Sequence, residues 1–203
     1  MHRSLILVGL FLVGILLVGC KASTSTSIDA LENPLTAEYV ADSMLEYVTF
    51  MRIRAEEKGE KITDPTVLRA IDEVMVSSRE LQKKAHEAQD AGKRGSLYGI
   101  EGNFGAGEVL LSGETLYTDY EFELSVAPEV EVYLAKHVNP HTAEELFSQT
   151  AKSLGSIQSY RGAQRYTVGV LSQSDWNEFR TVVFYSKGMK QVIALAQLQG
   201  KVR

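Results

Sequence analysis

The stretch TVVFYSKGMKQVIALA, residues 181–196, decides the fold of this chain. Residues 181–185 and 192–196 are apolar at nearly every position, a pattern typical of central strands that are covered on both faces. Residues 186–190 separate these two runs and include Gly188, which favours a tight turn. The stretch therefore predicts a β-hairpin in the interior of a sheet.

Further strands are predicted upstream of this hairpin. Residues 121–126 and 129–134 alternate between apolar and polar side chains, which indicates half-buried strands. Residues 107–111 and 165–168 add two more short apolar segments. We expect about six or seven short strands in a sandwich or barrel over residues 96–203, with the strand order left open.

The chain before this β region changes to a helical period. One helix is expected over residues 37–58, with Thr36 as its N-cap and an apolar stripe formed by Val40, Met44, Tyr47, Val48 and Met51. A second is expected from Asp64-Pro65, an N-cap followed by proline, to about Asp90. Its stripe comprises Leu68, Ile71, Val74, Met75, Ser78, Leu81 and Ala85.

These two helices predict an antiparallel hairpin over residues 37–95, whose apolar faces meet each other or cover a neighbouring domain. Residues 91–96 contain two glycines, and the hydrophobic period changes there from about 3.6 to two. We therefore place the domain boundary in this segment and expect an α+β protein, with a helical hairpin followed by an all-β sandwich or barrel.

The first residues have the layout of a signal peptide. Arg3 gives a cationic start, residues 5–19 are apolar, and Cys20 follows. The apolar run is shorter than the roughly 20 residues that a membrane-spanning helix needs. Residues 17–20, Leu-Val-Gly-Cys, resemble the bacterial lipobox. The resemblance implies that residues 1–19 are removed and that Cys20 carries acyl chains such as palmitate.

An ordinary secretory signal with an incidental cysteine is the alternative at this position. With lipid on Cys20, the protein would be held at a membrane of the bacterial cell envelope and face the periplasm or the exterior. Residues 20–36 are rich in serine, threonine and small residues, and we expect a flexible tether there. The sequence does not distinguish an inner from an outer membrane.

Composition excludes two classes of function. The chain has 26 acidic and 21 basic side chains, so nothing in its charge favours a nucleic-acid partner. Cys20 is the only cysteine, so the body that follows it has no thiol and can form no internal disulfide. We expect partners of two kinds: the membrane, reached through Cys20, and another protein of the envelope.

Candidate catalytic and metal-binding residues are few. His137 and His141 have helical spacing, but Asn139-Pro140 between them disfavours a continuous helix, and only Glu144 and Glu145 are near in sequence. The glycine-rich segment 99–107 lacks the strand and helix that a phosphate loop requires. No Gly-x-Ser-x-Gly motif is present. We therefore predict no enzyme activity, no catalytic residue, no metal and no cofactor.

The β region is aromatic. Its rings either pack in the core or gather at one end as a ligand or partner surface, and the first interpretation is favoured. These side chains are Tyr117, Tyr120, Tyr133, Tyr160, Tyr166, Trp176, Phe184 and Tyr185.

Residues 102–198 resemble the DM-thirteen domain, also called the electron-transfer DM domain. The resemblance rests on the segments 107–109, 119–122, 127–134, 154–155, 162–166, 176–185 and 196–198, together with Leu116. It implies a small extracytoplasmic β module. It also implies a redox role that depends on a cysteine near the end of the penultimate strand. Ser186 occupies that position here, and a hydroxyl cannot pass through thiolate or sulfenate states.

Two functions follow as expectations. The first is a membrane-anchored lipoprotein that acts as a non-catalytic binding or assembly module. The second is a redox or electron-transfer accessory protein that uses a bound cofactor or the thiol of a partner.

Overall fold

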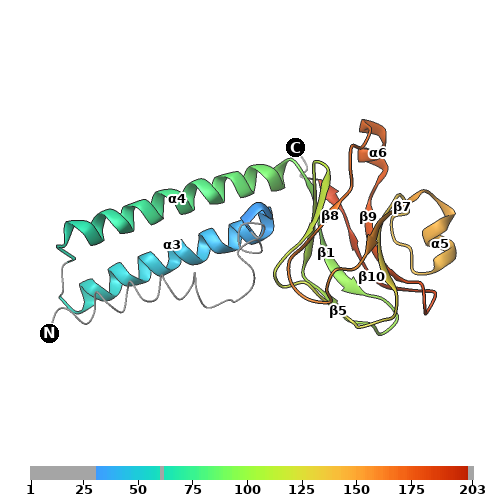
Figure 1. Ribbon diagram of the computed structural model, residues 1–203, viewed down its shortest axis with the longest axis horizontal. Helices are drawn as coiled ribbons and strands as arrows, with labels where there is room; N and C mark the ends of the chain where they lie inside the picture. Colours follow the sequence, from blue (N-terminus) through green and yellow to red (C-terminus); the bar gives the residue numbers. More distant parts are fainter. Residues whose placement is uncertain (1–30, 60–61, 201–203) are drawn as a thin grey trace. The chain divides into compact units, whose positions relative to one another are not determined.

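The computed structural model describes residues 31–59 and 62–200. Two long helices, α3 (Pro34–Glu57) and α4 (Pro65–Asp90), form a hairpin that is followed by an antiparallel β domain (Figure 1). The predicted fold class is therefore confirmed. Within the described ranges, no helix is both long and apolar enough to cross a membrane. The predicted signal peptide and Cys20 lie outside the described residues.

Helix α3 begins at Pro34, and its N-cap is Asn33. The Asn33 side chain accepts a hydrogen bond from the Leu35 amide at 3.0 Å and donates to the Thr118 carbonyl at 2.7 Å. The prediction of Thr36 as N-cap was wrong, because Asn33-Pro34 supplies both the cap and the proline that starts a helix. Residues 33–36, which the sequence assigns to a flexible tether, are instead buried, and residues 34–36 belong to α3. The predicted tether residues 20–30 lie outside the described residues.

Helix α4 begins as the sequence predicts. Asp64 is the N-cap and accepts a hydrogen bond from the Thr66 amide at 2.8 Å, while Pro65 occupies the first helical position. The helix ends at Asp90. Proline suits the first helical position, because the amide that it lacks would have no partner within the helix.

The β domain is built around one long antiparallel sheet that nearly closes on itself. Its order is β7-β6-β9-β10-β1-β3-β4-β8, with β11 also paired to β1, and β2 and β5 form a separate pair. The strands are β1 (Lys93–Gly99), β2 (Gly105–Ala106), β3 (Glu108–Ser112), β4 (Thr115–Thr118), β5 (Glu123–Leu124), β6 (Val130–Ala135), β7 (Ala151–Ser156), β8 (Gln164–Thr167), β9 (Thr181–Ser186), β10 (Gln191–Gln197) and β11 (Gln199–Gly200).

These strands outnumber the six or seven that the sequence predicts. The strands without a predicted counterpart are β1, β2, β4, β7 and β11. Of these, β2 and β11 are only two residues long, which is too short to produce a readable alternation. Two short helices, α5 (Ala143–Ser148) and α6 (Gln173–Glu178), lie in the connections between strands.

The hairpin of β9 and β10 is confirmed. Ser186 pairs with Gln191 at the turn, and the pairing continues to Thr181 with Gln197. Every residue of β9 is buried, as expected for a strand covered on both faces. One face belongs to a cluster that includes Phe184 and Phe122, whose ring centroids lie 5.3 Å apart. The other belongs to a cluster with Val183 and Leu195.

The strand predicted over residues 121–126 is only partly correct. Phe122 and Leu124 are buried, but Val126 is 82% exposed and β5 covers Glu123–Leu124 alone. The alternation therefore indicates the correct inward side chains at its start. The chain then leaves the sheet at Ser125, before the period ends.

The predicted boundary at residues 91–96 is a direct junction. Helix α4 ends at Asp90 and β1 begins at Lys93. The Lys93 ammonium donates hydrogen bonds to the carbonyls of Trp176 and Phe179, the second at 3.0 Å. Gly92 is needed here, since a Cβ at this position would lie 2.7 Å from the Leu111 carbonyl oxygen.

Candidate functional site

The residue at the position of the family cysteine, Ser186, is fully buried at the end of β9. Its hydroxyl donates to the Pro128 carbonyl at 2.5 Å and accepts from the Met189 amide at 3.1 Å. The side chain therefore joins the turn after β9 to the segment that enters β6. A thiol is a weaker donor and acceptor than a hydroxyl, so serine suits these two partners.

The histidines are placed in a loop before α5. The ring of His137 accepts from the Asn139 amide at 3.2 Å, and the Asn139 side chain is 2.8 Å from His141 Nε2. Glu145 belongs to a capping box with Thr142 and also accepts from the His141 amide at 2.6 Å. These backbone hydrogen bonds, the one from His141 above all, lower the pKa of Glu145. No helix runs through residues 137–141, as Asn139-Pro140 predicts.

Metal ligation finds no support in this loop, where the polar side chains cap the backbone instead. Among residues 31–59 and 62–200, no group of three or more histidine, cysteine, aspartate or glutamate side chains is placed to hold a metal ion.

Four of the eight aromatic side chains that the sequence singles out are buried in the core. Tyr133, Tyr166, Phe184 and Tyr185 are buried, whereas Tyr120 is 41% exposed. Tyr133 and Tyr185 also form an edge-to-face cluster with Phe147, at centroid distances of 5.6 to 6.2 Å. Phe147 is 52% exposed, so this cluster reaches the surface. The sequence did not single out Phe147, because its helix has only six residues.

Charged neighbours fix the tyrosine at the centre of that cluster. The Tyr133 hydroxyl donates to Glu131 at 2.7 Å, and Lys187 forms an ion pair with the same carboxylate. Burial, and then the hydrogen bond to Glu131, raise the pKa of Tyr133 to about 12. Hydrogen bonds from Lys187 and Tyr133 lower the pKa of Glu131. The tyrosine is therefore held neutral and the glutamate held ionised.

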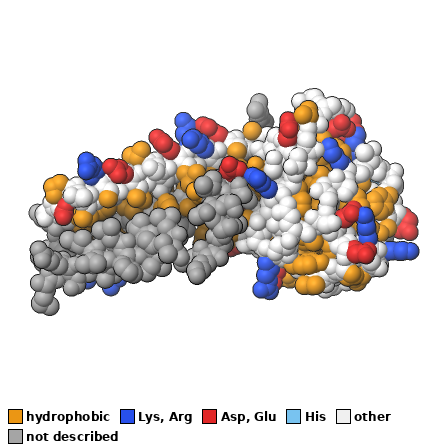
Figure 2. All heavy atoms as spheres, in the orientation of Figure 1, with side chains coloured by type: hydrophobic (Ala, Val, Ile, Leu, Met, Phe, Trp, Pro, Cys, Tyr) orange, Lys and Arg blue, Asp and Glu red, His pale blue; other side chains and the backbone are white. Residues whose placement is uncertain are grey.

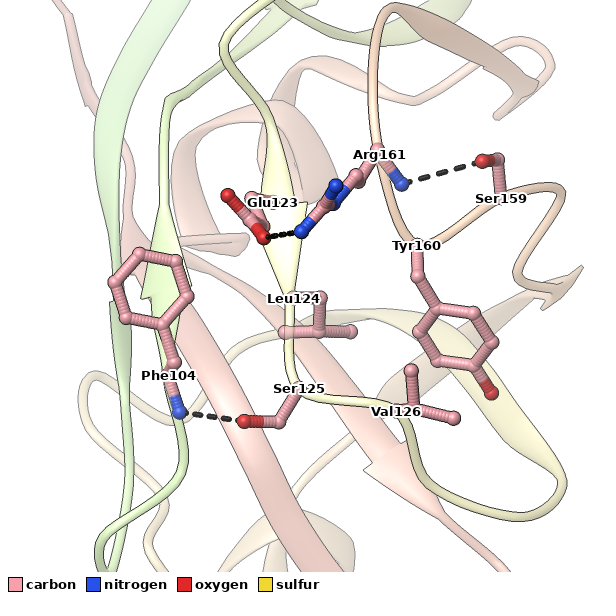
Figure 3. Close-up of a pocket in the computed structure, with 8 residues that line it drawn as sticks. All are labelled: Phe104, Glu123, Leu124, Ser125, Val126, Ser159, Tyr160 and Arg161. Atoms are coloured by element: carbon pink, nitrogen blue, oxygen red, sulfur yellow. Dashed lines mark hydrogen bonds and ion pairs between the residues drawn. The ribbon is translucent and has the colours of Figure 1, made fainter.

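An open cleft of about 650 Å³ lies where β5 meets the loop 159–161 (Figure 3). The rings of Phe104 and Tyr160 lie on opposite sides of Leu124, and the Val126 side chain lies beside Tyr160. Phe104 is 53% exposed and Val126 is 82% exposed, so apolar surface is open to solvent. The cleft was not predicted, because its residues come from three segments that only the fold brings together.

Polar groups lie on several sides of this cleft (Figure 3). Arg161 and Glu123 form an ion pair at 2.5 Å. The Phe104 amide donates to the Ser125 hydroxyl at 2.7 Å, and the Tyr160 hydroxyl donates to the Ala127 carbonyl. An apolar floor with a few polar groups is the usual composition of a small-molecule site. No nucleophile with an adjacent base is found in this set of lining residues.

The chain thus combines an N-terminal helical hairpin with a nearly closed antiparallel β domain that carries a partly apolar surface cleft. The model of the family described as "Electron transfer DM13" matches residues 96–198, just over half of the chain. The chain belongs to this family, and the predicted resemblance is confirmed. Its β domain is thus a domain associated with electron transfer. No curated protein and no solved structure matches the chain.

Proposed function

We propose that this protein is a lipid-anchored lipoprotein of the bacterial cell envelope whose β domain acts as a non-catalytic binding or assembly module. The observation that carries the second half of the proposal is the environment of Ser186. Ser186 is fully buried, and its hydroxyl is hydrogen-bonded to the Pro128 carbonyl and the Met189 amide. The side chain at this position therefore stabilises the turn and supplies no thiol.

The anchor rests on the sequence. Residues 17–20 resemble a lipobox, they follow an apolar run of signal-peptide length, and Cys20 is the only cysteine. Helix α3 then starts at Pro34, which leaves residues 21–32 between the proposed lipid and the helical hairpin. Two acyl chains would hold the protein stably at a membrane, whereas one would not.

The anchor is tested by replacing Cys20 with serine in the native host and following incorporation of a labelled fatty acid. We expect the label to be lost and the uncleaved precursor to accumulate. Lys21→Ser is the matched control, because it alters the neighbouring residue and leaves the thiol. Labelling of the Cys20→Ser protein at the wild-type level would refute the anchor.

A second candidate function is supported by the family match: a redox or electron-transfer accessory that uses a bound cofactor or the thiol of a partner. The two proposals differ in what the protein carries. We propose to purify the chain from its host and record its absorption spectrum and metal content. A colourless, metal-free protein supports the binding module, and a stoichiometric chromophore or metal supports the accessory.

A further inference from the structure

The two helices of the hairpin meet along a row of small side chains. On α3 the buried residues of this row are Ala37, Ala41 and Val48, and on α4 they are Ser78 and Ala85. Because a helix turns by about 100° per residue, these positions define one seam on each helix. The remaining side chains of α3 and α4 then lie on one flank of the seam or on the other.

One flank is polar, and its side chains form hydrogen bonds and ion pairs with one another across the two helices. Arg52 pairs with Asp72 at 3.1 Å, and Asp42 accepts from Gln82 at 2.7 Å. Glu38 accepts hydrogen bonds from His86 and Gln89 at 2.6 and 2.7 Å. Burial alone would raise the pKa of Glu38, but these hydrogen bonds outweigh it and the pKa is lowered. We call these seven residues the polar flank.

The opposite flank is apolar. Val40, Met44, Tyr47 and Met51 follow one another at intervals of four, three and four residues, and they lie about 40–100° from the seam, on the side away from Glu38 and Asp42. The same reasoning places Val74 and Leu81 of α4 on this side, opposite Asp72 and Gln82. We call these six residues the apolar flank. In Figure 2, hydrophobic side chains form a band beneath the row of charged ones on α4.

The side chains of this flank remain accessible. Met44 is 46% exposed, Tyr47 is 44% exposed, Met51 is 40% exposed and Val74 is 38% exposed. An amphipathic helix normally turns its large apolar side chains toward a core, and here the seam takes alanines instead. A helical hairpin has only one seam, so an uncharged row beside it is the arrangement found in half of a four-helix bundle.

The dimensions match a second hairpin of the same kind. Helices of 24 and 26 residues are about 36 to 39 Å long, and two of them side by side are about 20 Å wide. The whole side of the hairpin therefore covers about 700 to 800 Å², close to the roughly 800 Å² per partner of a standard stable interface. The six residues of the apolar flank form the middle of this side, within residues 40–51 and 74–81. The face carries no charge among its six residues, so contact with its own copy brings no like charges together.

We propose that the apolar flank is the contact surface for a second copy of this chain, and that two hairpins pack by it into a four-helix bundle. A two-fold arrangement places Met44, Tyr47 and Met51 of each copy against the other helix pair. The polar flank stays outside, where its ion pairs remain hydrated. The inference goes beyond the proposed binding function and does not depend on the lipid anchor.

Site-specific crosslinking of the full chain in its host cells tests this proposal, because Cys20 is the only native cysteine. Met44→Cys and Tyr47→Cys place a thiol on the apolar flank. Thr49→Cys places one two residues away, on the side of the polar flank and also exposed. With a short bifunctional thiol reagent, we expect a covalent homodimer from the first two variants and only the background of the unaltered chain from Thr49→Cys.

A second set of variants tests the surface itself, with dimer yield from Tyr47→Cys as the readout. Met51→Glu puts a carboxylate into the contact and is expected to lower the yield by about tenfold or more. Ile53→Glu is the matched control, because Ile53 is 51% exposed but lies outside the apolar flank, and its yield should be unchanged. Equal yields from all three cysteine variants, no homodimer from Met44→Cys and Tyr47→Cys, or an adduct with a different protein would each overturn the proposal.

Discussion

The β domain and the helical hairpin differ in what their interiors are made of. In the β domain, large side chains such as Phe122, Phe184 and Ile193 are almost completely buried. Beyond the first turn of α3, the buried residues of the hairpin are Ala41, Val48, Ser78 and Ala85, whereas Phe50 and Ile53 are more than half exposed. Burial of apolar area is the main favourable contribution to folding, so the β domain holds most of the stability that the chain generates by itself.

The comparison also explains how the hairpin is held. It borrows contacts from the β domain: Asn33 bonds to Thr118, the Ser112 hydroxyl donates to the Ala88 carbonyl at 3.1 Å, and Tyr39 stacks on Tyr120 at 4.0 Å. A region with few large buried side chains opens locally at a lower free energy than a packed sheet. The helical hairpin therefore depends more than the β domain does on contacts outside its own core.

The largest effect is expected from a ring deletion in each region. Phe184→Ala removes a fully buried ring and should reduce the free energy of unfolding by about 3–5 kcal/mol. Phe50→Ala, in an exposed position of α3, should change it by no more than about 0.5 kcal/mol. Denaturant titrations of the two variants decide the matter. Comparable losses from both would remove the contrast between the two regions.

The next effect concerns the turn after β9. Ser186→Cys weakens the hydrogen bonds with Pro128 and Met189 in a buried place, so we expect a loss of about 1–3 kcal/mol. Thermal melts under reducing conditions measure it, with the exposed Ser174→Cys as control. A near-neutral change would show that the position tolerates the thiol of its family and that the serine has no task of its own.

The two helix caps sharpen the contrast further. Asn33→Ala loses the cap of α3 and also the bond to Thr118, whereas Asp64→Ala loses only the exposed cap of α4. We expect about 2 kcal/mol for Asn33→Ala and about 1 kcal/mol for Asp64→Ala. Amide hydrogen exchange in α3 and α4 reports each loss locally. If Asn33→Ala affects exchange in α3 no more than Asp64→Ala does in α4, the hydrogen bond from Asn33 to Thr118 of β4 does not contribute to stability.

The smallest effect depends on pH. Asp119 is buried, one of its carboxylate oxygens has no hydrogen-bond partner, and a Cβ on Gly107 would lie 2.6 Å from that oxygen. Burial raises the pKa of Asp119 above its ordinary value of 3.8, with backbone hydrogen bonds opposing this and Glu108 and Glu121 adding to it. The folded state therefore favours the protonated form.

Because the folded-state pKa is raised, Asp119 stabilises the fold fully below its ordinary pKa, and this contribution is lost as pH rises through the folded-state value. Asp119→Asn mimics the neutral acid and should be more stable than wild type by about 1 kcal/mol at neutral pH. The difference should vanish in acid. Melts of both proteins from pH 3 to 7 test this, and an advantage that does not depend on pH would contradict the assignment.

Several elements could be predicted because their signals are local. Proline after Asp64 marks the start of α4, and the two apolar runs around Gly188 mark β9 and β10. The short strands β2 and β11 could not be predicted, since each is defined by its partner across the sheet and not by its own period. Among the site residues, Ser186 was singled out by the resemblance, but its hydrogen-bond partner Pro128 lies 58 positions away in another segment.

The cleft of Phe104, Leu124 and Tyr160 illustrates the same limit. Phe104 lies in a segment that sequence reasoning interprets as a linker and turn, and Tyr160 looks like an ordinary core residue. Only the pairing of β2 with β5, and the bond from the Leu124 amide to the Tyr160 carbonyl, bring the three together. A surface made by non-local pairing leaves no pattern in any one of its segments.

The sequence by itself determined the two helices, the interior hairpin of the sheet and the absence of any thiol after Cys20, because period, caps and composition act over a few residues. The tertiary structure decided which face of α3 is buried. Of the predicted stripe Val40, Met44, Tyr47, Val48 and Met51, only Val48 is buried, and Ala37 and Ala41 complete the buried row of the seam. Contacts between distant residues fix this rotation. Asn33 bonds to Thr118, 85 positions away, and the Arg52–Asp72, Gln82–Asp42 and His86–Glu38 contacts of the polar flank join residues 20 to 48 positions apart.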